Sequence, residues 1–517
     1  YVNKSVLATM PQGEGAEDFL RRLEVPGLRL AEVETALDEA VFNAHRDGEP
    51  DIPGDSLRRA LRHTFIALFK LSDDRAAAAT EKFLVGWLRD RNALLVPAAE
   101  DSFGVPHRSF REFMAGRYLF GNPLPDPNDP ETEDDWKVAG PRLVKREPDT
   151  DKWRDVLRFA AALDKPLDVA TALDELCPEG AARDSAEFQQ VFLSAEIARD
   201  AGPSLSRFKT GERVSARIKS QLIHVMRDTG EGEYPHDPPN NPPLVPPRTR
   251  LEAGLLLDSL GWTPPDLYAF IPIRNTQYAI AKYPVTVLQY RRFCEAGDYP
   301  DPQWWRGQRG MDAEGKWQDL GDEAWQWFRR ANEKEKRVPY YWDNPRFGAA
   351  RRIFPVVGVT WYEAAAYCVW LNRHRDDPGV NEGGKVPEGF SFRLPLETEW
   401  AAAAGGDEAN RYPWQRTPAE VTRDEILSRA NTNESDLKGT SPVCMYPSGA
   451  SLFGVMDMSG NVWEWQANLY EKGEPYRALR GGSWGNNQYG ARAAARSYSH
   501  PNDNWDISGF RVLASPG

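Results

Sequence analysis

This sequence has few cysteines, few histidines and no long apolar run. Its four cysteines include no C-x-x-C pair, which argues against a disulfide framework and favours a reducing compartment, the cytoplasm. No apolar run approaches the ~18 residues that span a bilayer, so no membrane segment is expected. Acidic residues exceed basic ones by 77 to 64, and the net charge of −13 disfavours nucleic acid as a partner.

A complete phosphate-binding loop is also missing. There are two Gly-Lys pairs, Gly315–Lys316 and Gly384–Lys385, and in each case another glycine lies five positions before the glycine of the pair. However, Trp317 and Val386 stand where such a loop needs a Ser or Thr hydroxyl for Mg²⁺. This fragment is therefore expected to bind no nucleotide.

The chain is long enough for several domains, because its 517 residues exceed the ~250–300 at which one hydrophobic core stops growing. Helical periodicity dominates up to residue 265, and short apolar stretches with many glycines and tryptophans follow. We therefore expect a multidomain protein with a mostly α N-terminal half. Its parts are a winged-helix-like domain over 1–125, a helical stack over 126–265 with a proline-rich loop at 230–247, and an α+β domain over 266–517.

Within 1–125 the pattern indicates a helix, a strand, a turn, a second strand and a second helix. The first helix covers Glu81–Arg91, the first strand covers Leu94–Val96, and the last helix covers Pro106–Leu119. This order is the outline of a winged helix. One apolar helix face is formed by Leu57, Leu61, Phe65 and Leu68. If the last helix is simply amphipathic, Phe110, Phe113 and Leu119 face the core.

The string FGVPHRSFREFMAGRYL, residues 103–119, resembles the end of the winged-helix segment in NACHT-type signal-transducing NTPases. The resemblance implies that the N-terminal half is a signalling arm, and that an NTPase or effector domain precedes Tyr1 in a longer chain. An ordinary amphipathic helix also accounts for the string.

Ordered motifs fill the last half of the chain. They are YAIAKYPVTVLQYRRFC (278–294), FPVVGVTWYEAAAYCVWL (354–371), FRLPLETEWAAAA (392–404), FGVMDMSGNVWEW (453–465), YRALRGGSW (476–484) and SGFRV (508–512). In this order they resemble the formylglycine-generating-enzyme (sulfatase-modifying-factor) family. The resemblance implies a C-type-lectin-like fold in which most glycines and tryptophans serve packing. An aromatic-rich insertion at 301–347 is likewise expected to be mostly core.

The same resemblance implies structural calcium, a cation that takes six to eight oxygen ligands. One site would use the spaced residues Asp457, Gly460, Val462 and Glu464. A second would use Asn431, the Thr432 carbonyl, Asp436 and the Leu437 carbonyl. The alternative is that Asp457 and Glu464 only cap turns.

The family's enzymes act through two cysteines near the C-terminus, which bind Cu(I) as thiolates. At the matching positions this chain has Asn486 and Ala491, and no cysteine follows Cys444. The related iron-dependent sulfoxide synthases use a His/Glu cluster, but the seven histidines here show no H-x-x-x-H spacing. We therefore expect no copper and no catalytic residue, and interpret the domain as non-enzymatic.

The segment between Trp484 and Gly509 is rich in Asn, Ser, Tyr, His and Asp, and resembles the variable region of proteins diversified by retroelements. In those lectin-like proteins the variable residues bind the ligand. Tyr and Trp give rigid contact area, while Ser and Asn give adaptable hydrogen bonds. The expected ligand-binding residues are Asn486, Asn487, Gln488, Tyr489, Ala491, Ala493, Ser497, Tyr498, Ser499, His500, Asn502, Asn504, Trp505 and Asp506.

We expect the ligand to be a protein. We also expect ten members of this set to be mostly exposed and gathered on one surface: Asn486, Asn487, Gln488, Tyr489, Ser497, Tyr498, His500, Asn504, Trp505 and Asp506. Three alternatives stay open. Such residues also dominate ordinary loops. The domain could be a formylglycine-generating-type oxidoreductase or its degenerate relative, or a structural assembly module without a ligand.

Overall fold

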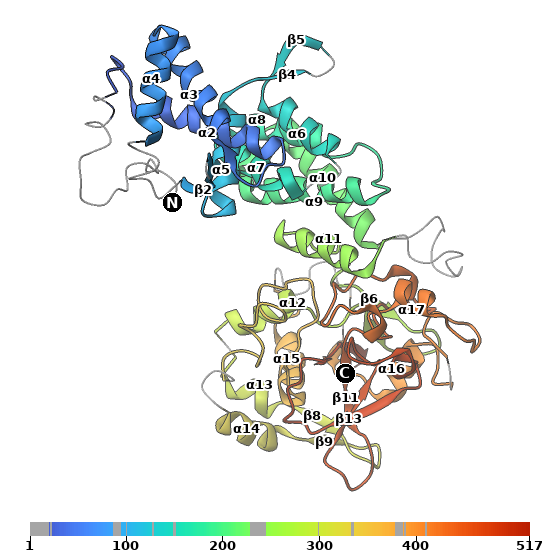
Figure 1. The fold of residues 1–517 in the computed structure, drawn as a ribbon. Coiled ribbons are helices and arrows are strands. Elements are labelled where there is room, and N and C mark those ends of the chain that lie inside the picture. The colour runs from blue at the N-terminus through green and yellow to red at the C-terminus, as the bar shows by residue number, and fades with distance from the viewer. Residues whose placement is uncertain are drawn as a thin grey trace. The chain divides into compact units, whose positions relative to one another are not determined.

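The computed structural model forms two compact units, Tyr1–Ile218 (unit 1) and Lys219–Gly517 (unit 2). Figure 1 shows the helices and strands along the chain. The residues that the structure describes are 20, 23–85, 95–99, 101–126, 129–147, 151–227, 245–297, 299–331, 336–377, 386, 389–408 and 411–516. The proline-rich loop at 230–247 lies outside them up to residue 244, and the three-domain division stays a prediction.

Unit 1 is mostly helical, as predicted. Its helices are α2 (Leu30–Arg46), α3 (Gly54–Phe69), α4 (Asp73–Phe83), α5 (Arg108–Gly121), α6 (Trp136–Arg146), α7 (Asp151–Ala162), α8 (Pro166–Leu176), α9 (Ser185–Ala201) and η3 (Gly202–Arg207), followed by α10 (Lys209–Arg227), which continues into unit 2. Strands β1 (Ile52–Pro53), β2 (Val96–Ala99) and β3 (Ser102–Gly104) form a sheet in the order β1-β3-β2. Strands β4 (Leu124–Asp126) and β5 (Asp129–Asp134) form a hairpin.

The order helix, strand, strand, helix expected around residue 100 is present as α4, β2, β3 and α5. The part of the predicted first helix beyond residue 85, and the strand start at Leu94, lie outside the described residues. Two of these apolar side chains are exposed. Leu68 is 61% exposed because it lies in the last turn of α3, before Lys70 turns left-handed at φ 53°. Phe110 is 48% exposed because it lies in the first turn of α5 and contacts the ring of His107.

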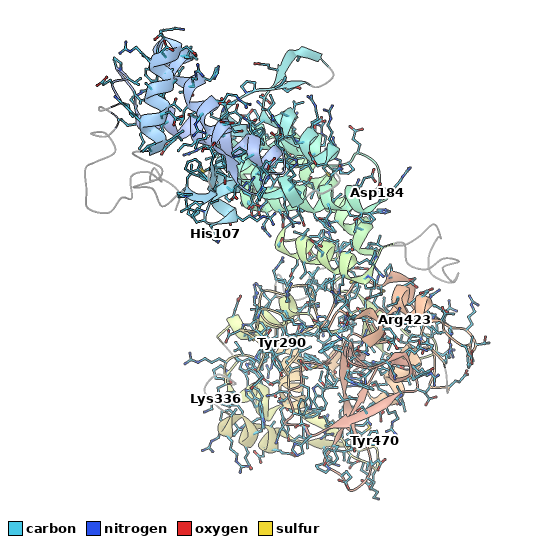
Figure 2. All side chains as sticks on the ribbon, in the orientation of Figure 1. His107, Asp184, Tyr290, Lys336, Arg423 and Tyr470 are labelled. Carbon is cyan, nitrogen blue, oxygen red and sulfur yellow. The ribbon has the colours of Figure 1, made fainter. Side chains whose placement is uncertain are left out.

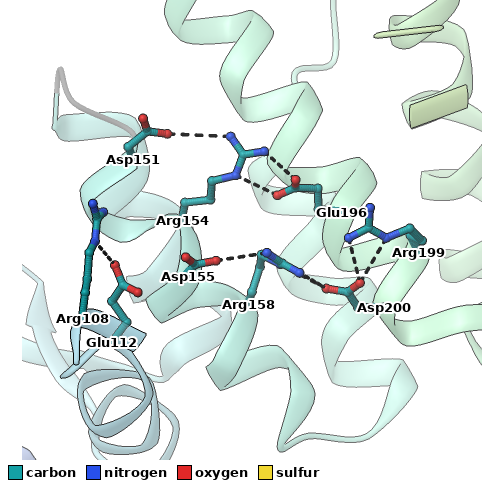
Figure 3. A network of polar contacts seen from close by, with 9 residues as sticks. All are labelled: Arg108, Glu112, Asp151, Arg154, Asp155, Arg158, Glu196, Arg199 and Asp200. Atoms are coloured by element: carbon teal, nitrogen blue, oxygen red, sulfur yellow. Dashed lines mark hydrogen bonds and ion pairs between the residues drawn. The ribbon is translucent and has the colours of Figure 1, made fainter. Parts of the chain in front are cut away.

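Ion pairs connect α7 to α9 along one side of the helical unit (Figure 3). Arg154 Nε donates to Glu196 at 2.8 Å, and one turn further on Arg158 Nη2 donates to Asp200 at 2.7 Å. The four-residue spacing on both helices places successive pairs on matching faces. These pairs are partly exposed, so packing rather than charge supplies most of the stability of this contact.

Unit 2 begins with the end of α10 and with α11 (Pro247–Ser259). The further helices are α12 (Val287–Glu295), α13 (Pro302–Arg306), α14 (Gly321–Arg330), α15 (Trp361–Arg373), α16 (Glu397–Ala403), α17 (Arg423–Arg429), η4 (Asn433–Ser435), η5 (Pro447–Gly449) and η6 (Gln488–Ala491). One sheet has the order β10 (Phe390–Arg393), β15 (Leu513–Pro516), β7 (Ala279–Ala281), β6 (Phe270–Pro272). The other has the order β13 (Arg496–Ser499), β12 (Arg477–Arg480), β11 (Trp463–Leu469), β8 (Arg309–Met311), β9 (Trp317–Asp319), with β14 (Ser508–Gly509) beside β11.

The core of unit 2 is aromatic and is centred on α15. This helix begins at Thr360, whose hydroxyl caps the Glu363 amide while the Glu363 carboxylate accepts from the Thr360 amide. Trp361 Nε1 donates to the Gln466 carbonyl at 2.8 Å, and Trp465 Nε1 donates to the Val359 carbonyl at 2.9 Å. The two buried indoles therefore fix β11 against α15, and both of their N–H groups are paired.

Helix α11 packs on the C-terminal domain, although the sequence placed it in the helical stack. Arg250 is 1% exposed and donates to the carbonyls of Met226 (3.0 Å) and Leu427 (3.3 Å), and its guanidinium lies 4.5 Å from the centre of the Tyr446 ring. A side chain at Gly254 would collide with Pro442. The helix therefore belongs to unit 2. None of the helices in the described part of the chain is both long and apolar enough to cross a membrane.

Candidate functional site

The segment after β12 is closed into a loop by its own ends. It starts at Gly481–Gly482, where φ is +98° and +74°, and a side chain at Gly482 would lie 2.5 Å from the Gly490 carbonyl. Only glycine fits such a left-handed turn with so close a backbone. Trp484 then stacks on Phe347 and donates its Nε1 to the Asp506 carbonyl at 3.3 Å. These contacts bring the two ends of the segment together.

Neither position expected to replace a catalytic thiol offers a nucleophile. Asn486 Oδ1 accepts from the Ser483 hydroxyl at 2.7 Å and from its amide at 3.1 Å, which holds the side chain in the turn. Ala491 is fully buried, and its carbonyl accepts from the Ser459 hydroxyl. Burial also raises the pKa of the Cys444 thiol to about 12, so this cysteine stays protonated.

Most of the predicted ligand-binding residues are accessible, but three are not. Exposed members are Asn487, Tyr489, Tyr498, Asn502 and Trp505, and half-buried ones are Asn486, Gln488, Ser497, His500, Asn504 and Asp506. Ala491 and Ala493 are fully buried, and Ser499 is 8% exposed. These three predictions were wrong. Ala493 packs in the core around Trp400 and Leu513, and the Ser499 hydroxyl donates to Asp503 at 2.5 Å.

The exposed residue Tyr489 lies in a first cluster of polar side chains. The Gln488 amide donates to Glu434 at 2.9 Å, and its carbonyl accepts from the Tyr412 hydroxyl at 2.8 Å. The Arg492 guanidinium lies 4.7 Å from the centre of the Tyr489 ring. Neighbouring segments thus hold the backbone here and leave the Tyr489 side chain 58% exposed.

Tyr498 belongs to a second group, which contains two residues that the sequence did not single out. Its ring centre lies 4.8 Å from that of Tyr470 and 5.0 Å from that of Tyr476, and His500 contacts Tyr476. Tyr470 and Tyr476 flank the turn between β11 and β12. Their position on either side of Gly473 and Pro475, turn residues between two strands, was the available signal. That the two tyrosine groups share one surface stays a prediction.

Glu464, predicted to bind calcium, forms a buried ion pair instead. Its two oxygens accept from Arg511 Nη2 and Nε, each at 2.7 Å, and Oε2 also accepts from Trp400 Nε1 at 2.7 Å. Glu464 and Arg511 both have fully buried side chains. A cation at this carboxylate would have to compete with a guanidinium, so the donor set at Glu464 does not fit calcium.

Asp457 differs, because one of its oxygens is free of such partners. Oδ2 is buried and accepts no hydrogen bond in the described part of the chain. Burial raises the Asp457 pKa to about 8, against the opposing effect of Arg511. Gly460 and Val462 are buried nearby in sequence. A calcium ion held by Asp457 and backbone carbonyls stays a prediction.

The second predicted calcium site is not assembled. Asp436 is exposed and pairs with Arg248 at 2.7 Å and with Lys438 at 2.8 Å. The Leu437 carbonyl accepts from Arg346, and the Thr432 carbonyl and Asn431 Oδ1 both accept from the Ser435 hydroxyl. Across the described residues, no group of three or more His, Cys, Asp or Glu side chains could hold a metal ion.

Comparison with known proteins finds a family model that matches this part of the chain. The model of the sulfatase-modifying factor enzyme 1-like domain matches residues 268–516. Hercynine oxygenase of Mycobacterium tuberculosis is 29% identical over 256 residues, which are 46% of this chain and 52% of that protein. The inactive C-alpha-formylglycine-generating enzyme 2 of Mus musculus is 29% identical over 268 residues, 46% of this chain and 76% of that protein.

The chain thus spans about half the length of the hercynine oxygenase, at 52%. Among solved structures, Treponema denticola variable protein 1 is 20% identical with a TM-score of 0.28, over 48% of this chain and 91% of that chain. The family match lies within unit 2. The resemblance of 103–119 to NACHT-type NTPases stays a prediction.

Proposed function

We propose that the sulfatase-modifying-factor-like domain at residues 268–516 is a non-enzymatic module, which recognises a protein ligand through the loops of 484–509. The observation that carries this proposal is that the segment lacks the catalytic thiols and has exposed aromatic side chains. Buried Ala491 and turn-bound Asn486 replace thiols, while three aromatic side chains of the same segment are left in solvent: Tyr489 at 58%, Tyr498 at 52% and Trp505 at 54% exposure.

Such exposure of large aromatic side chains is typical of contact surfaces. Tyr and Trp are enriched among the residues that dominate binding energy, because they bury much area with few rotatable bonds. The backbone beneath them is held by Glu434, Tyr412 and Trp484. The mouse relative is named as an inactive enzyme, which is consistent with a domain of this kind that does no chemistry.

Comparative capture tests the proposal. The full chain and a Tyr489→Ser/Tyr498→Ser/Trp505→Ser variant are immobilised separately, and proteins retained from the source cell are quantified by mass spectrometry. A protein retained by the wild type alone is then purified, and its Kd for both chains is measured by calorimetry. We expect the variant to melt at the same temperature and to lose at least tenfold in affinity, since hot-spot residues each contribute about 2 kcal/mol or more. Equal retention by both chains contradicts the proposal.

An oxygenase is the second function to consider, because the domain is 29% identical to a hercynine oxygenase. Iron chemistry of that kind requires histidine ligands. In the described part of unit 2, His224 lies in α10, His374 stacks on Trp370 and His500 contacts Tyr476. Among the described residues, no group of three or more His, Cys, Asp or Glu side chains could hold a metal ion. Recognition is therefore the function that the geometry supports better.

The remaining expectations extend this proposal. The helical unit 1 would connect recognition to an NTPase or effector domain in the cytoplasm, a proposal that rests on the resemblance of the string 103–119 alone. Diversification of 484–509 by a retroelement is tested in the flanking DNA. A near-copy of this coding segment, mismatched only at adenines and next to a reverse transcriptase gene, supports it, whereas its absence there contradicts it.

A further inference from the structure

Three tyrosines gather at one end of the β13-β12-β11 sheet (Tyr470 is labelled in Figure 2). The Tyr470 amide donates to the Tyr476 carbonyl at 2.9 Å, so the two residues face each other across the β11–β12 hairpin. On β13, Tyr498 pairs with Ala478, two residues after Tyr476. Because side chains alternate across a sheet, this register places Tyr476 and Tyr498 on the same face. We call Tyr470, Tyr476 and Tyr498 the tyrosine cluster.

The ring of Tyr498 is exposed, whereas Tyr470 and Tyr476 are half-buried. Tyr498 is 52% exposed, and its plane makes angles of 40° with Tyr470 and 50° with Tyr476. They therefore offer no single flat floor on which a sugar ring could stack. They instead present several electron-rich faces close together, an arrangement that attracts a compact cation.

One cation already uses the cluster. The Arg496 guanidinium lies 4.4 Å from the centre of the Tyr470 ring. Its Nε and Nη2 donate to the two oxygens of Glu397 at 2.8 and 2.7 Å. Arg480 also donates to Glu397 at 2.8 Å, so two guanidinium groups share this carboxylate. The negative charge of Glu471 also acts on Arg496, so that Glu397 and Glu471 together balance the two arginines.

The hairpin turn next to the cluster is acidic. Residues Glu471–Pro475 are all exposed, and the one cation among them, Lys472, pairs with Glu314 at 2.6 Å. The negative charge of Glu471 acts on Arg496, whereas Glu474 forms no ion pair with any residue that the structure describes. A carboxylate without a counter-charge beside aromatic faces favours a positively charged ligand.

We propose that the tyrosine cluster, together with Glu474, binds a cationic side chain, arginine or lysine, of a protein ligand. This inference rests on the proposed recognition function and names the chemistry of its partner. It also extends the binding surface to Tyr470 and Tyr476, which lie outside the 484–509 segment.

Fluorescence anisotropy with the full chain tests the proposal. The probe is a labelled nine-residue peptide of alternating glycine and arginine, and the matched probe has citrulline in place of each arginine. Citrulline keeps the shape of arginine and lacks its charge. We expect the arginine peptide to bind at least tenfold more tightly, and the neutral methyl glucoside not to compete. Equal affinity for both peptides, or competition by the glycoside, overturns the proposal.

Variants separate the cluster from the general negative charge of the chain. Tyr498→Ala should weaken arginine-peptide binding roughly 3- to 30-fold, the range of a cation–π contact, while Tyr498→Phe keeps most of the affinity. Tyr340→Ala, at a tyrosine that is 48% exposed elsewhere, is the matched control and should bind as the wild type does. An equal loss in both alanine variants, or no loss in either, overturns the assignment.

The two proposals fail separately. If capture of a partner depends on Tyr489, Tyr498 and Trp505 but the arginine peptide binds no better than the citrulline peptide, recognition stands and the cationic ligand is wrong. If the arginine peptide binds at Tyr498 but the triple variant retains its partner, the cluster binds cations and the recognition face lies elsewhere.

Discussion

At the scale of single residues, the most consequential arrangement is the Glu464–Arg511 pair. Both side chains are fully buried, and Arg511 also donates to the Met456 carbonyl at 2.8 Å. A charge left unpaired in such a place has neither water nor a counter-ion. Glu464 therefore holds β11 to the C-terminal strand region rather than a metal ion.

Neutralising Glu464 should accordingly destabilise the protein. We expect Glu464→Gln to lower the free energy of unfolding by about 3–5 kcal/mol, because it leaves the Arg511 charge buried and unpaired. Urea denaturation followed by tryptophan fluorescence measures the change. Glu314→Gln is the control, since its pair with Lys472 is exposed and should contribute less than about 1 kcal/mol. A small effect at Glu464 would contradict the structural role.

Asp258 should make stability depend on pH. It is 4% exposed, and burial raises its pKa to about 6, although Arg352 opposes the shift. Because the folded protein holds this proton more tightly than the unfolded chain, the contribution is fully present below about pH 4 and is lost as pH rises through about 6.

Urea midpoints of the wild type and of Asp258→Asn at pH 4.5 and 7.5 check this. Asparagine can still accept from the Arg352 amide, which lies 2.8 Å from Asp258 Oδ2. We expect the wild type to lose up to about 2 kcal/mol more than the variant over this range. Parallel pH profiles for the two proteins would show that Asp258 does not titrate in this window.

Calcium at Asp457 is tested by chelation. If Oδ2 ligates a cation, EDTA should lower the melting temperature of the wild type by about 2–4 °C, a change of about 1 kcal/mol, and added calcium should restore it. Asp457→Asn should show neither response. A melt that EDTA leaves unchanged, with no metal found by elemental analysis, would leave Asp457 as a protonated buried carboxyl.

At the scale of elements, α11 is joined to the C-terminal domain through one buried cation. Arg250 donates to carbonyls at the end of α10 and in the C-terminal domain, and Asp258 at the other end of α11 accepts from the Arg352 amide. These contacts are long-range in sequence, so helical periodicity alone could not have revealed them.

Two arginines on the same helix provide the test. Arg250→Ala should lower the unfolding free energy by about 3 kcal/mol or more, because it opens a cavity and leaves several carbonyls unpaired. Arg248→Ala removes an exposed pair with Asp436 and should change it by less than about 1 kcal/mol. Chemical denaturation of both variants gives the comparison. Similar values would mean that α11 is not anchored by Arg250.

At the scale of the whole molecule, the prediction concerns catalysis. We expect the full chain with copper to convert no cysteine of a sulfatase-type peptide to aldehyde, as measured by mass spectrometry, because Asn486 and buried Ala491 provide no thiolate. The matched variant Asn486→Cys/Ala491→Cys restores both thiols and should gain Cu(I) binding. Aldehyde formed by the wild type above a buffer control would refute the non-enzymatic function.

The sequence by itself determined the broad organisation. Ordered motifs in 278–512 identified the domain that the family match confirms, and periodicity located the helices of unit 1. Both signals are local or depend on fixed spacing, which the linear chain carries directly. The sequence alone also showed that the thiols are missing, because a residue's chemical type does not depend on the fold.

Only the tertiary structure decided which side chains are free to act. Ala493 and Ser499 stand in a segment rich in binding-type residues, yet packing against Trp400 and Leu513 buries the first and Asp503 holds the second. The Glu464 carboxylate, which the spacing assigned to calcium, accepts from Arg511, a residue 47 positions away. Tyr470 and Tyr476 meet Tyr498 only because β11, β12 and β13 pair in register. Burial and partnership between distant residues are properties of the fold, so no local pattern could have revealed them.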